Sequence, residues 1–295
     1  MGESNFKPQT SFGLCLMVNF NGNLVQPSES VLPFFNRGFS YGDAVFETVK
    51  AVGGKLIFWE DHYFRLMASM RLLRMEIPMT FTPEYFVEQC NRLIESQAVC
   101  SAAWRLRLTC FRDSTGRYTP DENKVSFVIN CKPLEQPSFS SEIPNYRVDL
   151  YKDHFVQPAM LSNLKTNNKI LNVLASIFAK ENDLDNCILV NDNKEVVEAI
   201  QSNIFLLFGN EIHTPPLTSG CLDGIIRKQI IRMANELDLS CKETTVNPFD
   251  LQKADELWLT NSIQGIRAVT NYRRKEYQSK KYAQAVGLLN EKALV

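Results

Sequence analysis

The chain has 295 residues, of which 44% are hydrophobic and 22% are charged, and its formal net charge is −1. This length exceeds the roughly 100 to 200 residues of a usual single domain, so we expect two α/β domains or one large one. The near-zero charge and the dispersed Lys and Arg residues provide no extended field for nucleic acid or for a membrane surface. Small-molecule chemistry is therefore the default expectation.

The start of the chain, MGESNFKPQT, has no basic stretch leading into an apolar one, and no apolar run approaches ~20 residues. We therefore expect a cytoplasmic protein without a membrane span. The eight cysteines, Cys15 among them, occur singly and form no CxxC pair. The three histidines do not lie at ligand spacing, so we expect no metal site.

The first half of the chain alternates strand and helix patterns. Residues 11–26 alternate in hydropathy and turn at Asn21-Gly22, which predicts a hairpin. Thr82 followed by Pro83 is typical of a helix start. In chain order we predict a strand at 44–59 broken at Gly53-Gly54, helices at 59–75 and 82–97, and strands at 103–111 and 124–131.

A stretch rich in Pro and Ser without periodicity, residues 132–145, predicts an interdomain linker. We therefore expect an N-terminal domain at 1–131 and a C-terminal domain at 146–295. In the second domain we predict helices near 165–182, 224–237 and 282–294, and strands at 186–192, 202–208 and 256–262.

One charged residue interrupts an apolar stretch of the second half. The segment VVEAIQSNIFLL, residues 196–207, reads as a strand in which Glu198 falls where burial is expected. A buried carboxylate is costly unless it is paired, so Glu198 calls for a cationic partner. Lys165 precedes a predicted helix start at a domain edge, where a lysine can point into a cleft.

Six segments of the chain form an ordered set: RGFSYGDAVFETVK, EDHYFRLMAS, LKTNNKILNVLA, VVEAIQSNIF, TPPLTSGCLDGIIR and ADELWLTNSIQGI. Their order and spacing resemble the class IV aminotransferases, which are fold-type IV pyridoxal phosphate (PLP) enzymes. The family includes branched-chain and D-amino acid aminotransferases and aminodeoxychorismate lyase. The resemblance covers about residues 15 to 270 and implies a two-domain α/β fold with its active site at the domain interface.

The resemblance implies roles for two of the residues noted above. Lys165 matches the lysine that forms the Schiff base with PLP. Glu198 matches the carboxylate that keeps the pyridine nitrogen protonated, which would give its buried charge a partner on the cofactor. Lys169 falls outside the matching position, and we interpret it as a surface or supporting residue.

The resemblance also implies a phosphate site. Arg65 matches the family's phosphate arginine, and the backbone amides of Ile225 and Ile226 would face the phosphate from a helix N-terminus. Many relatives have threonine where this chain has Ile226, so one hydroxyl donor is lost. Ser262 matches the family's hydroxyl donor after a strand.

For the substrate, the resemblance implicates Tyr41, Phe46 and Arg112, although each of them could equally be structural. Tyr41 and Phe46 fall near the family's pocket wall, and Arg112 falls where several relatives bind a carboxylate. The family's site is completed across a dimer interface, so a homodimer is expected. Ser114 stands where the D-amino acid enzymes carry a histidine, which disfavours that type.

Three functions stay open at this stage. The first is amino transfer between an amino acid and a 2-oxo acid, with the branched-chain type the commonest. The second is the lyase reaction, in which aminodeoxychorismate gives 4-aminobenzoate and pyruvate. The loop FRDSTGR, the GIIR turn without threonine and TNSIQGI resemble the lyases. The third, a PLP-binding homologue without turnover, is disfavoured by the intact Lys165, Glu198 and Arg65.

Overall fold

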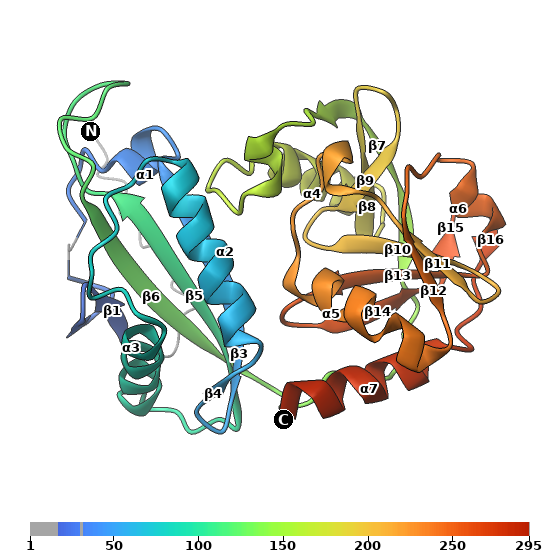
Figure 1. Cartoon of the computed structure of the whole chain (residues 1–295), viewed down its shortest axis with the longest axis horizontal. Coiled ribbons are helices and arrows are strands. Elements are labelled where there is room, and N and C mark those ends of the chain that lie inside the picture. Colours follow the sequence, from blue (N-terminus) through green and yellow to red (C-terminus); the bar gives the residue numbers. More distant parts are fainter. Residues whose placement is uncertain (1–16, 30–31, 295) are drawn as a thin grey trace, which may run out of the picture.

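In a computed structural model of the chain, the structure describes residues 17–29 and 32–294. The start of the predicted hairpin at 11–16, with Cys15, lies outside the described residues. Figure 1 shows two α/β halves side by side, which are joined by an extended segment that passes beneath them. This arrangement confirms the predicted two-domain α/β fold.

The first half is one mixed-length antiparallel sheet with two helices on one face. Its strand order is β2-β1-β6-β5-β3-β4. Leu66 and Met70 of one helix and Phe86 of the other pack against Leu106 and Leu108 of the central strand β5. Because side chains alternate along a strand, the opposite face of the sheet is left for the second half. The elements are β1 Val18–Phe20, β2 Asn23–Val25, α1 Arg37–Ser40, β3 Ala44–Val52, β4 Lys55–Leu56, α2 Trp59–Leu72, α3 Pro83–Glu95, β5 Ala103–Arg112 and β6 Val125–Leu134.

Local sequence signals set the ends of these elements. The turn at Asn21-Gly22 joins β1 to β2, with both residues at positive φ, as the hairpin pattern predicts. The Thr82 side chain accepts a hydrogen bond from the amide of Tyr85, and Pro83 occupies the first helical position of α3. Helix α2 ends at Leu72, three residues before the end of the predicted segment.

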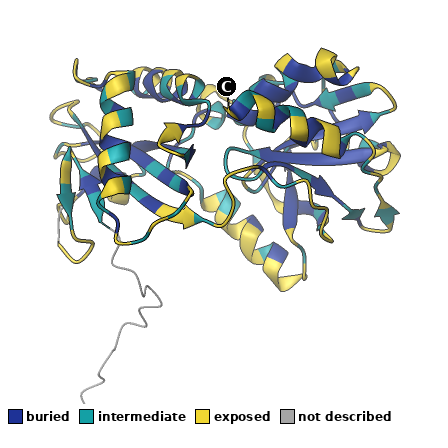
Figure 2. Ribbon diagram, turned by 90° about the horizontal axis from the view of Figure 1, so that it is seen from below, coloured by how far each residue is buried: buried dark blue, intermediate teal, exposed yellow. Residues whose placement is uncertain are grey.

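The second half contains two five-stranded sheets, with strand orders β12-β11-β10-β13-β14 and β16-β15-β7-β8-β9. Apolar residues of both sheets, such as Ile204 and Val196, share one core. Helices α5 and α7 cover the first of these sheets, and α4 covers the second. Figure 2 shows the buried strands inside the molecule and the exposed outer faces of the helices. The elements are β7 Arg147–Val156, η1 Met160–Asn163, α4 Ile170–Glu181, β8 Asn186–Asn191, β9 Val196–Ala199, β10 Asn203–Phe208, β11 Glu211–Thr214, η2 Leu217–Ser219, α5 Ile225–Met233, η3 Ala234–Leu237, β12 Ser240–Glu243, α6 Asp250–Lys253, β13 Glu256–Asn261, β14 Gly265–Val269, β15 Asn271–Tyr272, β16 Lys275–Glu276 and α7 Tyr282–Leu294.

The single strand predicted across 196–207 is wrong. The chain turns after Ala199, whose amide donates to the Ser202 carbonyl at 2.7 Å, and β9 and β10 then enter different sheets. Strand β6 continues to Leu134 and so overlaps the first three residues of the predicted linker. The exact division at 132–145 stays a prediction, although residues 135–146 contain neither helix nor strand.

The segment around Lys165 attaches the second half to the edge of the first-half sheet. The amide of Phe46 donates to the Lys165 carbonyl at 2.8 Å, and the amide of Asn167 donates to the Ala44 carbonyl at 3.0 Å. These bonds form an isolated antiparallel bridge between Val45 of β3 and Thr166. They fix the backbone of Lys165 at the boundary between the two halves.

Candidate active site

A cavity of about 650 Å³ lies between the two halves. From the first half, the side chains of Phe46, Arg65, Arg105 and Arg107 line it. The second half contributes the Lys165 and Lys169 side chains, the N-terminus of α5 and the turn after β13. The cavity therefore contains the candidate residues Arg65, Lys165, Glu198, Ile225, Ile226, Ser262 and Phe46.

The side-chain amine of Lys165 lies in this cavity and has a lowered pKa. Its Nζ lies 4.6 Å from the centroid of the Phe46 ring. Burial, and then the positive charge of Arg65, lower the pKa of Lys165 to about 7. A large fraction of the amine is therefore unprotonated at neutral pH, which is the state in which a lysine acts as a nucleophile or as a base.

Glu198 faces the same cavity from β9, where it pairs in register with Leu189. Its Oε2 accepts a hydrogen bond of 2.9 Å from the amide of Leu222. This is the one hydrogen bond of the Glu198 carboxylate among the described residues, and it leaves Oε1 without a partner there. Burial raises the pKa of Glu198, while the Leu222 amide and the charge of Lys169 act against that rise. Glu198 thus presents one free oxygen to a cationic or proton-donating ligand.

The N-terminus of α5 also lines this cavity. In the part of the chain that the structure describes, the amides of Ile225 and Ile226 donate to no acceptor, as expected in a first helical turn. Gly224 precedes them, and a Cβ there would lie 1.8 Å from Asn203 Oδ1. Ser262 follows β13 and lines the same cavity. Free amides at a helix N-terminus make an anion site.

Arg65 reaches this anion site from α2 of the first half. Its Nε and Nη2 donate to the two oxygens of Glu47 at 2.7 and 2.6 Å, and its Nη1 donates to the Asp223 carbonyl at 2.7 Å. His62 Nδ1 lies 2.6 Å from Glu47 Oε2. Burial alone would raise the pKa of Glu47, but the charges of Arg65 and His62 and their hydrogen bonds lower it to about 2. Arg65 is thus held rigidly beside α5.

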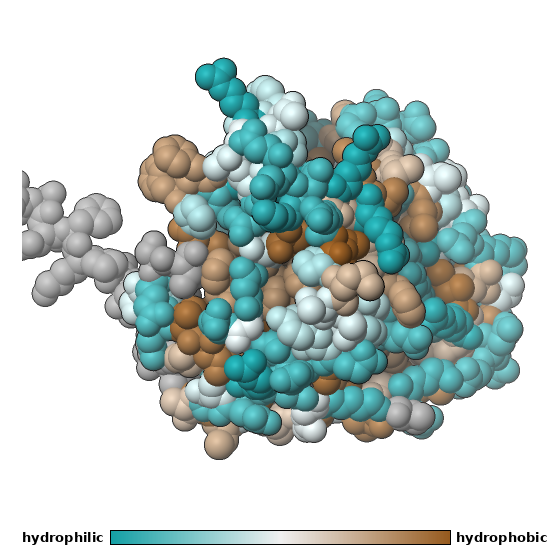
Figure 3. Space-filling view, turned by 60° about the vertical axis from the view of Figure 1, so that its left-hand side comes forward, coloured by the Kyte–Doolittle hydropathy of each residue, from teal (hydrophilic) through white to brown (hydrophobic). Residues whose placement is uncertain are grey.

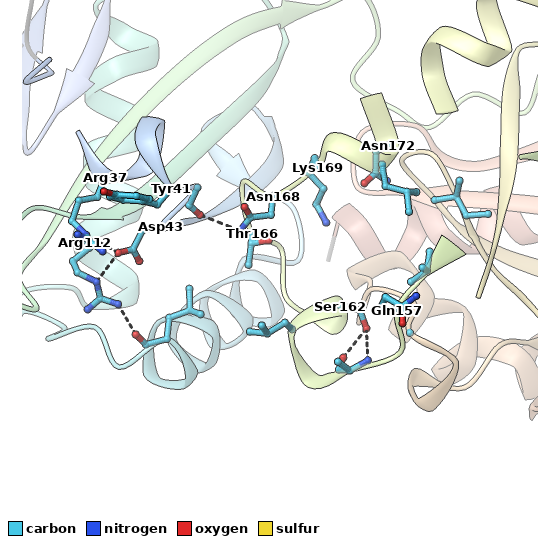
Figure 4. A pocket seen from close by; sticks show the side chains of 18 of the residues that line it. Arg37, Tyr41, Asp43, Arg112, Gln157, Ser162, Thr166, Asn168, Lys169 and Asn172 are labelled. Carbon is cyan, nitrogen blue, oxygen red and sulfur yellow. Dashed lines mark hydrogen bonds and ion pairs between the residues drawn. The ribbon is translucent and has the colours of Figure 1, made fainter. Parts of the chain in front are cut away.

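A second cavity, of about 720 Å³, adjoins the first. Lys169, Asn172 and Glu198 line both cavities, so the two meet at these three residues. Figure 4 shows the Lys169 side chain directed into the second cavity. Burial lowers the pKa of Lys169. The structure therefore places Lys169 inside the site, not on the outer surface.

Tyr41 and Arg112 line the second cavity and not the one that contains Lys165. Arg112 Nε donates to Asp43 Oδ2 at 2.9 Å, its Nη1 donates to Asn123 Oδ1 and its Nη2 donates to the Leu73 carbonyl at 2.6 Å. Figure 4 shows Arg112 turned toward Asp43. These contacts give Arg112 a structural role, because they join three segments of the first half. Its binding of a substrate carboxylate stays a prediction.

Sequence reasoning missed Arg105 and Arg107 as cavity residues. The guanidinium carbon of Arg107 lies 3.6 Å from the centroid of the Phe46 ring, and its Nη2 donates to Asn167 Oδ1 at 3.2 Å. The available signal was the alternation in AWRLRLTCF, which places two arginines on one face of a strand with leucines on the other.

Comparison with known proteins decides the family. The model of the family described as "Amino-transferase class IV" matches residues 44–272, which is most of the chain. The chain belongs to the class IV aminotransferases. Members of this family are PLP-dependent enzymes, so the predicted family and the expectation of an enzyme are both confirmed.

Individual relatives of this class IV aminotransferase differ in their named reactions. It is 26% identical over 94% of its length to a putative branched-chain-amino-acid aminotransferase of Methanocaldococcus jannaschii, and 95% of that protein is covered. It is 28% identical to an aminodeoxychorismate lyase of Bacillus subtilis, with 94% of each chain covered. The PLP-form structure of a branched-chain amino acid aminotransferase from Thermobaculum terrenum has a similar fold, with a TM-score of 0.80, 20% identity and 94% of each chain covered.

The residues of the cavity fit PLP. The free amides of Ile225 and Ile226 beside Arg65 suit its phosphate, the free oxygen of Glu198 suits a protonated ring nitrogen, and the Lys165 amine suits its aldehyde. Within the described residues, no group of three or more His, Cys, Asp or Glu side chains could hold a metal ion. No helix in the described part of the chain is both long and apolar enough to cross a membrane.

Proposed function

We propose that this class IV aminotransferase binds PLP in the cavity of about 650 Å³ and transfers an amino group between an amino acid and a 2-oxo acid. One observation carries the proposal. The amine of Lys165, whose pKa is lowered to about 7, enters a cavity that also contains an anion site and a free carboxylate oxygen. When bound, PLP would supply the aldehyde for covalent attachment and a ring that accepts electrons from the substrate Cα.

The residues of the chain have separate roles in this proposal. Arg65, the amides of Ile225 and Ile226, and Ser262 would bind the phosphate. Glu198 would hold the proton on the ring nitrogen. The Lys165 amine, once released from the cofactor, would accept the proton of the substrate Cα and return it to another carbon.

Phe46 would form the wall that confines Lys165 and the substrate. It is buried, and its ring is close to both the Lys165 amine and the Arg107 guanidinium. The apolar side chains of Val173, Ile177 and Ile200 line the same cavity. An apolar wall of this kind suits the side chain of a branched-chain amino acid, which makes the branched-chain type our first candidate.

A second candidate is aminodeoxychorismate lyase. The observation that favours it is the presence of two arginines, Arg105 and Arg107, in the same cavity, because the lyase substrate carries two carboxylates. In that reaction Lys165 would again move the proton, and elimination would release pyruvate and leave 4-aminobenzoate.

One assay separates the two candidates. The purified protein is incubated with aminodeoxychorismate, and separately with L-leucine or L-glutamate plus a 2-oxo acid. Formation of 4-aminobenzoate identifies the lyase, and formation of the new 2-oxo acid identifies the aminotransferase. If protein that carries PLP on Lys165 forms neither of the two products, both candidates are contradicted.

We further propose that the enzyme is a homodimer. Helix α4 exposes an apolar stripe, Ile170, Val173, Leu174 and Ile177, at helical spacing. Large apolar side chains of the first half, Phe34, Phe35 and Phe39, are also exposed. Figure 3 shows one face of the molecule, on which apolar side chains lie in patches among hydrophilic ones. Contiguous exposed apolar surface of this kind is typical of a protein interface.

Sedimentation tests the homodimer. A dimer of this type is expected to bury well over ~2,000 Å². Replacing Ile170 and Leu174, which do not line the cavity, with Glu should dissociate it, whereas a charge at the exposed position Met79 of the first half should not. A fully active monomer at assay concentration would refute the homodimer.

A further inference from the structure

Helix α2 of the first half is attached to α5 of the second half by two side chains. Asp61 and Arg65 are four residues apart and therefore lie on the same face of α2. Arg65 Nη1 donates to the carbonyl of Asp223, in the turn before α5, at 2.7 Å. Asp61 Oδ2 accepts a hydrogen bond of 2.7 Å from Nε2 of Gln229, in the second turn of α5. Helix α2 thus holds α5 at two points, one on each side of its first turn.

Asp61 also forms an ion pair with Arg232 of α5. Arg232 Nη1 donates to Asp61 Oδ2 at 2.7 Å, and Nη2 donates to Oδ1 at 3.0 Å. Burial alone would raise the pKa of Asp61, but the hydrogen bond and charge of Arg232, and then the charge of Lys228, lower it. Asp61 is therefore ionised at neutral pH. One carboxylate binds two side chains of α5, of which Gln229 is buried and Arg232 is largely exposed.

This attachment matters for the anion site, because its parts come from different halves of the molecule. Arg65 belongs to α2, whereas the free amides of Ile225 and Ile226 belong to α5. Ile57, just before α2, packs in the same apolar cluster as Ile226. Apolar packing is non-directional, so it does not fix how far α5 is rotated or shifted along its axis. The hydrogen bonds of Asp61 are directional and do fix it.

We propose that Asp61 is a positioning residue for the anion site, which holds α5 so that its free amides and the Arg65 guanidinium face the same phosphate. The bound phosphate would then also strengthen the contact between the two halves. This inference rests on the proposed function in treating the anion as the phosphate of PLP. Asp61 is not among the described residues that line the cavity, and its negative charge would repel a phosphate at close range. It therefore acts through α5 and not by contact with the ligand.

The test compares ligands with and without a phosphate. PLP, pyridoxal and inorganic phosphate are titrated into the full-length protein after removal of its cofactor. Asp61→Ala should weaken the binding of PLP and of inorganic phosphate by about tenfold and change that of pyridoxal by less than about threefold. Asp61→Asn should lose less, because its side-chain oxygen can still accept from Gln229. Glu122→Gln, which removes an exposed ion pair with Lys124, is the control and should change none of the three affinities.

A double variant tests whether Asp61 acts through α5. Arg232→Gln interrupts the same contact from the other helix, so Asp61→Ala combined with Arg232→Gln should lose no more PLP affinity than Asp61→Ala alone. Losses that add would overturn the proposal. Because Arg232 is largely exposed, the ion pair contributes little to stability, and Asp61→Asn should lower the melting temperature by less than about 4 °C.

Two further outcomes would overturn the positioning role. One is an equal loss of PLP and pyridoxal binding in Asp61→Ala, and the other is an unchanged affinity for inorganic phosphate in that variant. Borohydride reduction and peptide mapping of the wild type test the proposed function separately. If no PLP is found on Lys165 but Asp61→Ala still weakens inorganic phosphate binding, the proposed function is refuted and the positioning role of Asp61 is upheld.

Discussion

The buried pair of Glu47 with Arg65 should contribute strongly to stability, and Glu47→Gln tests this. The exposed fraction of the Glu47 side chain is 1%, and its carboxylate bridges Arg65 and His62 at 2.6 to 2.7 Å. Glutamine keeps the shape of the Glu47 side chain but leaves the Arg65 cation without its counter-charge. Removing one partner of a buried pair typically costs 3 to 5 kcal/mol, roughly.

The lowered pKa of Glu47 gives a second value for the contribution of this pair to the free energy of unfolding. It falls from 4.5 to about 2, and at 1.36 kcal/mol per pKa unit this corresponds to about 3 kcal/mol. Because the folded pKa is depressed, the stabilisation is complete above pH 4.5 and is lost as the pH falls toward 2. Glu47→Gln should therefore lower the free energy of unfolding by about 3 kcal/mol at pH 7, and the difference from wild type should narrow below pH 4.5.

Denaturant titrations at pH 7 and at several acidic pH values measure this difference. Glu236→Gln, which removes an exposed partner of Lys292, is the control and should cost less than about 1 kcal/mol. The affinity for PLP should also fall in Glu47→Gln, because Arg65 is no longer oriented toward the Asp223 turn. A stability equal to wild type at pH 7, or a difference that does not change with pH, would refute the reasoning.

Three further predictions concern residues of the two cavities. Reconstitution of the apoenzyme with PLP should speed up as the pH rises through about 7, where Lys165 loses its proton, and a rate independent of pH between 6 and 9 would contradict the lowered pKa. Glu198→Gln should retain PLP by absorbance yet lose turnover on the order of a hundredfold, and wild-type turnover would show that the carboxylate is structural. Arg112→Ala should lower the free energy of unfolding by about 2 to 4 kcal/mol, because it removes the hydrogen bonds to Asn123 and the Leu73 carbonyl and leaves Asp43 with Arg37 alone. A loss of kcat/KM by two to three orders of magnitude, roughly, with stability and PLP binding intact, would instead place Arg112 on the substrate.

The sequence was sufficient for features that depend on local pattern. Hydropathy periodicity located α2, α3 and β5, and Thr82 with Pro83 marked the start of α3. The motif order identified the family and implied that Lys165 and Glu198 share one site. These features follow from short-range chemistry, or from residues whose spacing is characteristic.

Other features depend on contacts that no local pattern encodes. The turn after Ala199 breaks an apolar run that looks continuous, because β9 and β10 are buried in different sheets. Arg112 was predicted to bind substrate, yet its guanidinium meets Asp43, Asn123 and Leu73, which are distant in sequence. Arg105 could not be assigned without the register that places it between two lysines.

The two backbone bonds that join Lys165 and Asn167 to β3 make the reactive amine dependent on both halves of the molecule. Glu198 and the N-terminus of α5 belong wholly to the second half, whereas the strand that carries Phe46 holds the lysine backbone in place. Any sliding of one half against the other would therefore carry the amine away from the groups it must act with. Recombination of halves from different relatives should succeed only when the start of β3 and the residues around Lys165 come from the same parent.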